Sequence, residues 1–360
     1  MKILVFLFLL LPAALILSDQ SWNSTDTTSS TSFAVVRPSN ASEVDLSVTN
    51  NYIASVNTGG YMLDAGDEAP TSSNSHFNGG VVTGNKFYWH GSDGSTVQTH
   101  GCFLGYNINW TVKYNYLTGV PYGIIFKSGT DAGVNMTFTS GGCAYNICRN
   151  GKFHVRGKGI NGVEVYNNTF YFGSGIVTPY YGIYLSHNQD RAVGAASKGW
   201  KIKNNIFYHV NSGTPFIYLS STDCLVGMEC DYNVYYCEGS SNHEPTFRIG
   251  SSTVSWSTWR NTYGMDAHSV IINPNFTNTT DLVPSVRMDY GTNLGSLWSM
   301  GLSLSATWTV GVSPQTQTQG DTWQVGARVF ASTVIPTPSK GVIKDEGRDV
   351  IYNDKIIRVK

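Results

Sequence analysis

One short pattern recurs along the chain and limits its fold more than any other feature. It is an Asn with an apolar residue three positions before it and another two positions after it, as in WKIKNNIFY at residues 200–208. Six copies lie 22 to 37 residues apart, with their Asn at Asn85, Asn115, Asn146, Asn168, Asn205 and Asn233. A repeat of this period is typical of a solenoid, in which each unit buries its apolar face only against its neighbours.

A second strand pattern comes between the Asn copies, and its residues alternate between apolar and mixed character. Strict alternation points successive side chains to opposite faces of a strand. The apolar pairs are expected to face inward, and they are Cys102/Leu104, Ile124/Phe126, Phe153/Val155, Ile183/Leu185 and Ile217/Leu219. The intervening pairs are expected to face outward, and they are Phe103/Gly105, Ile125/Lys127, His154/Arg156, Tyr184/Ser186 and Tyr218/Ser220.

Together the two patterns predict an all-β parallel β-helix with at least two strands in each coil. Equivalent strands of successive coils would pair in parallel, about 4.8 Å apart. An Asn at the edge of a strand tolerates a left-handed bend, so we expect the repeated Asn to make the bend between two strands. Stacked Asn amides would then hydrogen-bond along the axis of the solenoid.

Composition limits the partners of such a solenoid. The 360 residues contain 23 Lys and Arg against 24 Asp and Glu, a net charge of −1. With no global positive field, the chain is not expected to recruit nucleic acid or an anionic membrane. We also find no metal-ligand pattern of the CxxC kind, so no metal site is predicted.

The six cysteines suggest disulfides if the chain is secreted. Three of them, Cys143, Cys148 and Cys230, occupy repeat positions that are otherwise apolar, so we interpret them as small buried hydrophobic residues. A Cys224–Cys230 or Cys230–Cys237 bridge stays open, and Cys102 is unconstrained.

The ends of the chain differ in composition from its middle. Residues 1–18 combine Lys2 with an apolar run, which predicts a signal peptide and a secreted, extracellular or cell-surface protein; an uncleaved anchor is the alternative. A Ser/Thr-rich lead is expected at 19–32, the parallel β-helix at 33–330, a linker at 331–340 and a charged β-meander tail at 341–360. The aromatic segment around Trp256 and Trp259 would cap the C-terminal end of the solenoid.

The repeats VEVYNNTFY and WKIKNNIFY, together with MECDYNVYY, GMDAHSVIINPNF and DTWQVGARVF, resemble the right-handed parallel β-helix, or pectin-lyase-like, superfamily. The resemblance covers roughly residues 44–330 and implies a right-handed solenoid. That superfamily includes polysaccharide lyases, glycoside hydrolases, epimerases, phage tailspikes and adhesins. The resemblance therefore implies the fold and an extracellular polysaccharide as partner, without choosing among these activities.

Two cations, Lys127 and Arg156, are expected in one outward column on adjacent coils. Adjacent cations repel unless an anion lies between them, and the carboxylate of a uronate sugar is such an anion. Neutralising that carboxylate acidifies the neighbouring C5 proton. Lys127 would remove this proton in a β-elimination while Arg156 neutralises the carboxylate, and His154 or Tyr184 would protonate the leaving oxygen.

Three further residues are expected to bind the substrate. Lys158 and His187 follow the outward strands directly, and Tyr218 would add to Tyr184 a flat platform for sugar rings. The Lys-Ser pair at Lys127 and the Arg-Gly-Lys-Gly run at Arg156 are similar to the Lys and Arg fragments of alginate-lyase and chondroitinase-B-type enzymes.

The resemblance to these lyases does not extend to their calcium ligands. The nearest acids here, Asp131 and Glu164, do not form a cluster. The resemblance leaves Ca²⁺ as an open alternative, and the residues themselves call for no cofactor.

Three other interpretations stay open. The two cations are also compatible with ordinary solvated surface charges. A non-enzymatic glycan-binding, adhesin or structural β-helix protein would fit the low charge and the scarcity of acids. A glycoside hydrolase needs two carboxylates across the cleaved bond, and the expected outward columns contain none. The oligomeric state is left open.

Overall fold

The computed structural model describes residues 6–8, 15–24, 34–37, 46–56, 59–66, 78–91, 98–105, 108–128, 136–174, 180–187, 196–211, 213–294, 322–328, 330, 343–345 and 348–350. The chain divides into two compact units, Met1–Phe330 and Ala331–Lys360. The first unit is all-β apart from one short α-helix and one 3₁₀ turn in its described ranges.

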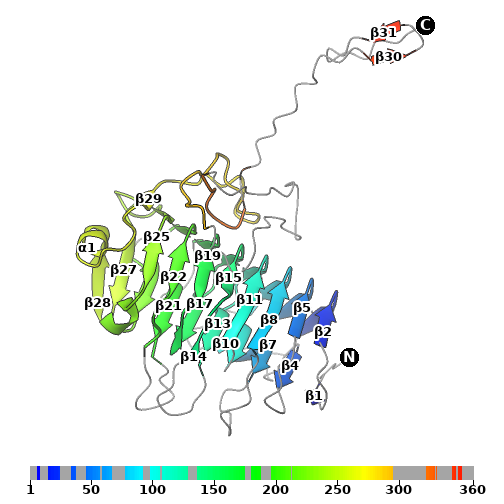
Figure 1. The fold of residues 1–360 in the computed structure, drawn as a ribbon, viewed down its shortest axis with the longest axis horizontal. Helices are drawn as coiled ribbons and strands as arrows, with labels where there is room; N and C mark the ends of the chain where they lie inside the picture. The colour runs from blue at the N-terminus through cyan, green and yellow to red at the C-terminus, as the bar shows by residue number, and fades with distance from the viewer. Residues whose placement is uncertain are drawn as a thin grey trace. The chain divides into compact units, whose positions relative to one another are not determined.

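Three large sheets make up the first unit (Figure 1). Sheet 1 contains, in spatial order, β1 (Phe6–Phe8), β4 (Ala34–Arg37), β7 (Gly59–Gly66), β10 (Gln98–Gly105), β13 (Tyr122–Lys127), β17 (Phe153–Lys158), β21 (Tyr181–Ser186), β24 (Ile217–Leu219), β27 (Thr246–Ile249) and β28 (Ser252–Ser255). Sheet 2 contains β2 (Leu15–Ser18), β5 (Leu46–Thr49), β8 (Asn78–Thr83), β11 (Ile108–Lys113), β15 (Gly142–Ala144), β19 (Glu164–Tyr166), β22 (Lys201–Lys203) and β25 (Glu229–Asp231). Sheet 3 contains β3 (Ser21–Ser24), β6 (Tyr52–Ser55), β9 (Lys86–Trp89), β12 (Tyr116–Thr118), β16 (Ile147–Arg149), β20 (Thr169–Phe172), β23 (Ile206–His209), β26 (Val234–Cys237) and β29 (Val270–Ile271).

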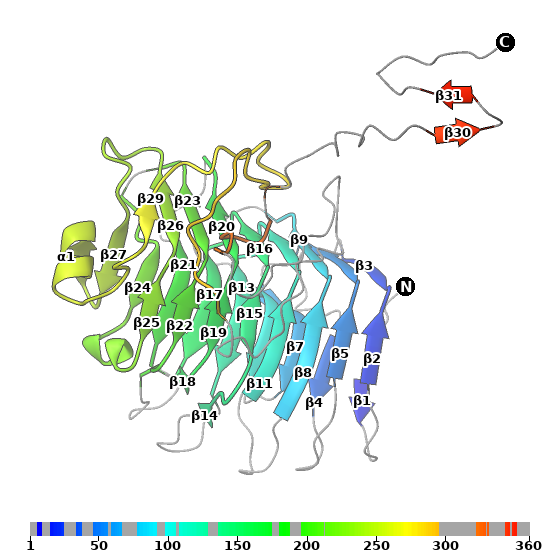
Figure 2. The ribbon, with the colours of Figure 1, turned by 45° about the horizontal axis from the view of Figure 1, so that its top comes forward.

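Each coil takes one strand from each sheet and then starts the next coil. β17, β19 and β20 form one such coil, and each pairs in parallel with its counterpart β21, β22 or β23 in the following coil. Figure 2 shows the strands of all three sheets stacked coil upon coil along one axis. The predicted all-β solenoid of parallel strands is therefore confirmed, with three strands per coil.

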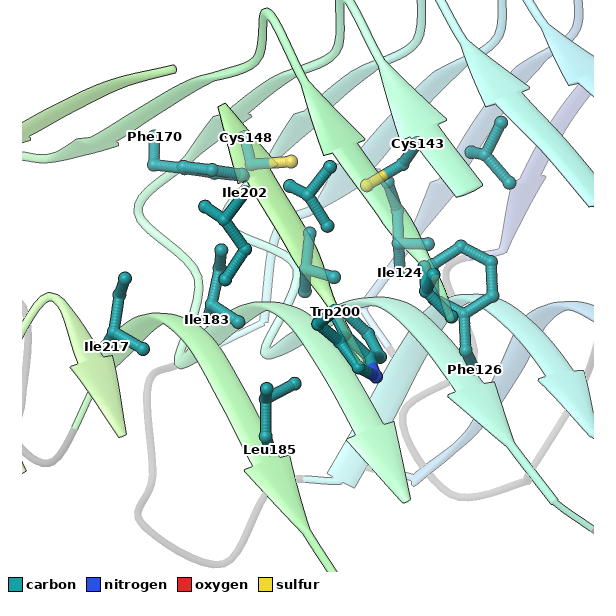
Figure 3. Packing of buried hydrophobic residues seen from close by; sticks show 14 of the residues in the cluster. Ile124, Phe126, Cys143, Cys148, Phe170, Ile183, Leu185, Trp200, Ile202 and Ile217 are labelled. Atoms are coloured by element: carbon teal, nitrogen blue, oxygen red, sulfur yellow. The ribbon is translucent and has the colours of Figure 1, made fainter. Parts of the chain in front are cut away.

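The core lies between the three sheets. Inward residues of successive coils stack there, for example Ile124, Val155, Ile183 and Ile217 from sheet 1. Figure 3 shows Trp200, Phe126 and Leu185 meeting in this interior. The described cysteines are all free and buried, which confirms the reading of Cys143, Cys148 and Cys230, and neither of the two considered disulfides is present.

The repeated Asn form a continuous buried ladder at the bend between sheets 2 and 3. The backbone N and the Nδ2 of Asn85 both donate to Oδ1 of Asn115, at 2.9 and 3.0 Å. The same pair of bonds links Asn51, Asn85, Asn115, Asn146, Asn168, Asn205 and Asn233 in order. The predicted amide ladder is present, and it includes Asn51 from a coil before the six copies.

The left-handed bend is made by the residue before each ladder Asn, so the expectation that the Asn itself bends was wrong. The residues with positive φ at this corner are Asn50, Gly84, Tyr114, Tyr145, Asn167, Asn204 and Tyr232. Because the preceding residue turns the chain, the ladder Asn can point its amide into the interior of the solenoid.

Aromatic residues gather at the C-terminal end of sheet 1, after the last ladder Asn. β27 and β28 form an antiparallel hairpin that leads into α1 (Trp256–Asn261). The indole of Trp259 is fully buried and stacks on Phe247, with ring centroids 4.3 Å apart. The remaining small elements are β14 (Met136–Thr137) paired with β18 (Ile160–Asn161) and the turn η1 (Thr222–Leu225).

The predicted end segments are described only in part. β1 and β2 lie in the predicted signal peptide, and β3 lies in the predicted Ser/Thr-rich lead, so the signal peptide and secretion stay predictions. In the second unit β30 (Ile343–Asp345) and β31 (Arg348–Val350) pair as an antiparallel hairpin, and the expected linker at 331–340 lies outside the described residues. None of the helices in the described ranges is long and apolar enough to cross a membrane.

Candidate functional site

The outer face of sheet 1 gathers aromatic and cationic side chains in rows that run from coil to coil. Three rows follow from the strand register. The first row contains Asp64, Phe103, Ile125, Arg156, Tyr184, Tyr218 and Arg248. The second contains Tyr61, His100, Tyr122, Phe153 and Tyr181, and the third contains Gly66, Gly105, Lys127, Lys158 and Ser186.

The first row carries stacked rings between two guanidinium groups. Tyr184 and Tyr218 stack with ring centroids 4.6 Å apart and an interplanar angle of 7°. The Cζ of Arg156 lies 5.0 Å from the Tyr184 centroid, and the Cζ of Arg248 lies 4.9 Å from the Tyr218 centroid. Cation–π attraction of this kind holds a guanidinium in place without neutralising its charge.

The stacking decides what a ligand would meet on this face. Tyr184 is flanked by Arg156 on one side and by Tyr218 on the other, so its ring faces are occupied. A sugar would therefore contact ring edges, phenol hydroxyls and the guanidinium groups. The two rings stack on each other between Arg156 and Arg248, so they do not offer the flat platform for sugar rings that was expected at Tyr184 and Tyr218.

Lys127 and Arg156 do not share a column, so that expectation was wrong. Lys127 pairs with Lys158 in the register, and Arg156 pairs with Ile125. The inward pair of β17 is Val155 and Gly157 instead of Phe153 and Val155, and this moves the outward pair to Arg156 and Lys158. The expectation that Phe153 faces inward was wrong, because its ring packs against Tyr122 and Tyr181 on the outer face. The two lysines thus face outward on adjacent coils, while Arg156 lies in the neighbouring row of the same face.

His154 points into the core, so its expected outward position and its role as an acid were wrong. Its side chain is 1% exposed and its ring stacks on Phe172, with centroids 4.0 Å apart. Nε2 accepts a hydrogen bond from the backbone N–H of Gly151 at 3.3 Å. Burial holds the pKa of His154 well below 6.5, with a further small lowering by His209, so the imidazole is neutral and out of reach of a polymer outside.

Tyr184 does face outward, as expected. Burial raises its pKa above 10.0, and the charge of the neighbouring Arg156 partly offsets this rise. The phenol is therefore protonated at neutral pH and suited to donate a proton or a hydrogen bond. Lys127 is 4% exposed, and its Nζ lies 5.9 Å from the centroid of the Phe103 ring.

His187 lies beside two residues that sequence reasoning missed. Its Nδ1 is 3.1 Å from Oγ of Ser220, and its Nε2 is 3.8 Å from Oδ2 of Asp223. Asp223 was not predicted as a site residue, because its closeness to His187 depends on how adjacent coils stack. Asp64 was also not predicted as a site residue, and it lies in the first row of the outer face.

The acids considered as calcium ligands do not fit that role. Glu164 lies on sheet 2, and its carboxylate is 3.7 Å from the Nζ of Lys201. Asp131 lies outside the described residues. Among the residues that the structure places, no group of three or more His, Cys, Asp or Glu is arranged to hold a metal ion.

No protein-family model matches this chain, no curated protein is significantly similar to it, and no solved structure matches its fold significantly. The function is therefore argued from the geometry of the outer face of sheet 1.

Proposed function

We propose that the chain is a secreted, right-handed parallel β-helix of the pectin-lyase-like kind that binds an anionic, uronate-containing extracellular polysaccharide. The α1 segment would close the C-terminal end of its core. The single observation behind the binding proposal is the row in which Arg156, Tyr184, Tyr218 and Arg248 follow one another on successive coils.

The spacing of this row suits a linear polyanion. Three coil steps separate Arg156 from Arg248, about 14 Å at about 4.8 Å per step. Lys127 and Lys158 add positive charge on the same face, one row away. A polysaccharide lying along the solenoid axis would place carboxylates near the guanidinium groups and hydroxyls near the phenol edges of Tyr184 and Tyr218.

Binding is tested with alginate, pectate and a glycosaminoglycan by isothermal titration calorimetry. The Arg156→Ala/Arg248→Ala double variant should weaken binding at least tenfold, and added salt should weaken binding to the wild type. Arg287→Ala removes an exposed arginine that pairs with Asp289 outside sheet 1, and it serves as the matched control. Equal affinity of the wild type and the double variant for every polyanion would contradict the proposal.

A β-elimination on the same face is the second candidate, because Arg156 lies beside Tyr184. Arg156 would neutralise the uronate carboxylate, Lys127 or Lys158 would remove the C5 proton, and Tyr184 would protonate the leaving oxygen. The ultraviolet absorbance of unsaturated uronates after incubation with each polysaccharide, with and without calcium, tests this. Binding without any such absorbance would contradict the β-elimination and support a non-enzymatic glycan-binding protein.

A further inference from the structure

At the edge of the outer face of sheet 1, a serine, a histidine and an aspartate from two adjacent coils come together. Ser220 directly follows β24, His187 directly follows β21, and Asp223 lies in η1. The Ser220 backbone N–H donates to the carbonyl of Leu185 at 2.8 Å, which fixes the end of one strand against the other. The parallel register thus sets the relative positions of Ser220 and His187.

The contacts follow the order of a nucleophile, its base and an orienting carboxylate. Oγ of Ser220 is 3.1 Å from Nδ1 of His187, a hydrogen-bond distance. The other ring nitrogen, Nε2, is 3.8 Å from Oδ2 of Asp223. A proton on Nε2 facing the carboxylate leaves Nδ1 as the acceptor for the serine hydroxyl.

These side chains are accessible to a substrate. The His187 side chain is 33% exposed and that of Asp223 is 64% exposed, and Ser220 is half-buried. The third row of the outer face, which contains Lys158, continues to Ser186 on the next coil. Ser220 directly follows the Leu185–Leu219 pair and therefore takes the next position in this row. A ligand held by Lys158 would therefore extend over Ser220.

From this constellation we propose that Ser220, His187 and Asp223 form a hydrolytic site for ester groups, specifically acyl esters on sugar hydroxyls of the bound polysaccharide. The choice of an acylated, anionic polysaccharide as substrate rests on the proposed function. The ester chemistry itself rests on the three side chains alone and is tested separately from binding.

The reaction would proceed in two balanced steps. Oγ of Ser220 attacks the ester carbonyl while Nδ1 of His187 takes the hydroxyl proton; the C–O bond to the sugar breaks, and the sugar oxygen receives that proton. The acyl group is then attached to Ser220. Water, deprotonated by the same nitrogen, attacks the acyl carbon, which releases the free acid and returns the proton to Oγ. The negative charge of Asp223, 3.8 Å from Nε2, would favour the proton on that nitrogen and the charged form of the imidazole.

The test uses the full chain and a fluorophosphonate probe that reacts with activated serines. The wild type should be labelled at Ser220, located by mass spectrometry of the labelled peptide. Labelling should fall at least tenfold in Ser220→Ala and in His187→Gln, and several-fold in Asp223→Asn. Ser252→Ala removes an exposed serine on β28 and serves as the matched control that keeps wild-type labelling. Circular dichroism confirms that each variant is folded.

The second readout is the release of acetate from acetylated alginate or acetylated pectate. The wild type should release acetate and Ser220→Ala should not. Absence of both labelling and acetate release in the folded wild type would overturn the proposal, as would equal labelling of the wild type and Ser220→Ala. Labelling of Ser220 in a protein that binds no polyanion would instead contradict the proposed function and leave the ester site standing.

Discussion

The Nδ2 of Asn233 donates to the Oδ1 of Asp266 at 3.0 Å, and this bond ends the buried Asn ladder. Every earlier ladder Asn donates to the next Asn. Asn233 has no next Asn, and two residues supply its acceptors instead. Oδ1 of Asp266 accepts from its side chain, and Oγ of Ser269 accepts from its backbone N–H at 2.8 Å. Ser269 in turn donates to Oδ1 of Asp266.

Asp266→Asn should destabilise the protein. The second carboxylate oxygen, Oδ2, accepts from the Tyr235 hydroxyl at 2.9 Å and from Nε1 of Trp259 at 2.7 Å. An amide supplies one acceptor oxygen instead of two, so at least one buried donor would lose its acceptor. The expected loss is about 2–4 kcal/mol, measured as the free energy of unfolding in urea. Stability equal to the wild type would contradict the terminating role of Asp266.

Asn168→Ala should be destabilising by a similar amount, because it interrupts the ladder in its middle. The backbone N and Nδ2 of Asn146 would both lose the acceptor Oδ1 of Asn168, and the carbonyl of Cys143 would lose a donor. We expect a loss of about 2–5 kcal/mol in urea unfolding. The control is Asn261→Ala at an exposed site on α1, which should change stability by less than about 0.5 kcal/mol.

Stability should fall with acidity because two buried histidines are neutral in the folded chain. Burial lowers the pKa of His209 to about 3, and His154 titrates well below 6.5 as well. Below about pH 6.5 the unfolded chain binds more protons than the folded one, so acid favours unfolding between pH 6.5 and 3. His209 contributes a slope of about 1.4 kcal/mol per pH unit in this window, and His154 adds to the loss of stability in the same direction below pH 6.5.

His209→Phe isolates one of these contributions. Neither ring nitrogen of His209 has a hydrogen-bond partner among the described residues, and Phe172 occupies the equivalent position on the preceding coil. Phe should therefore fit, and urea unfolding at a series of pH values should show a slope smaller by about one proton. An unchanged slope would mean that His209 is not the titrating group.

Gly157→Ala should strain the core against Trp200. A Cβ at position 157 would lie 2.4 Å from Cζ2 of the Trp200 indole, which is fully buried and donates from Nε1 to the Ile160 carbonyl. We expect a cost of about 1–3 kcal/mol. In a double-mutant cycle with Trp200→Leu, the two losses should be clearly less than additive, whereas simple additivity would show that the two residues do not compete for this space.

Gly157 also explains why the sequence predicted some positions of the outer face correctly and others wrongly. Apolar alternation identified the faces of β13, β21 and β24 correctly, because both inward positions there hold large residues. In β17 the second inward position is Gly157, and the indole of Trp200 fills its space from another coil. Pattern matching therefore selected Phe153 and Val155 and shifted Arg156 by two positions. Arg156 was still placed outward, but Phe153 and His154 were assigned to the wrong faces, because Phe153 lies on the outer face and His154 in the interior.

The fold was predictable because its signal repeats, whereas the site depends on contacts between coils. The ladder Asn recur with the same neighbours, so one copy supports the interpretation of the next. The apolar alternation gave the pairing of β21 with β24, but His187 and Asp223 lie beyond the ends of these strands. No repeated pattern covers those positions, so their nearness could not be predicted.

The ladder also indicates which parts of the chain tolerate insertions and deletions. Successive ladder Asn are 22 residues apart at Asn146 and Asn168 and 37 apart at Asn168 and Asn205, yet the bonds between them are the same. Insertions and deletions that leave each Asn and its preceding bend in place can thus reshape the outer faces without disturbing the interior. Evolution can therefore add or remove a whole coil as a unit, provided that its ends fall at equivalent Asn.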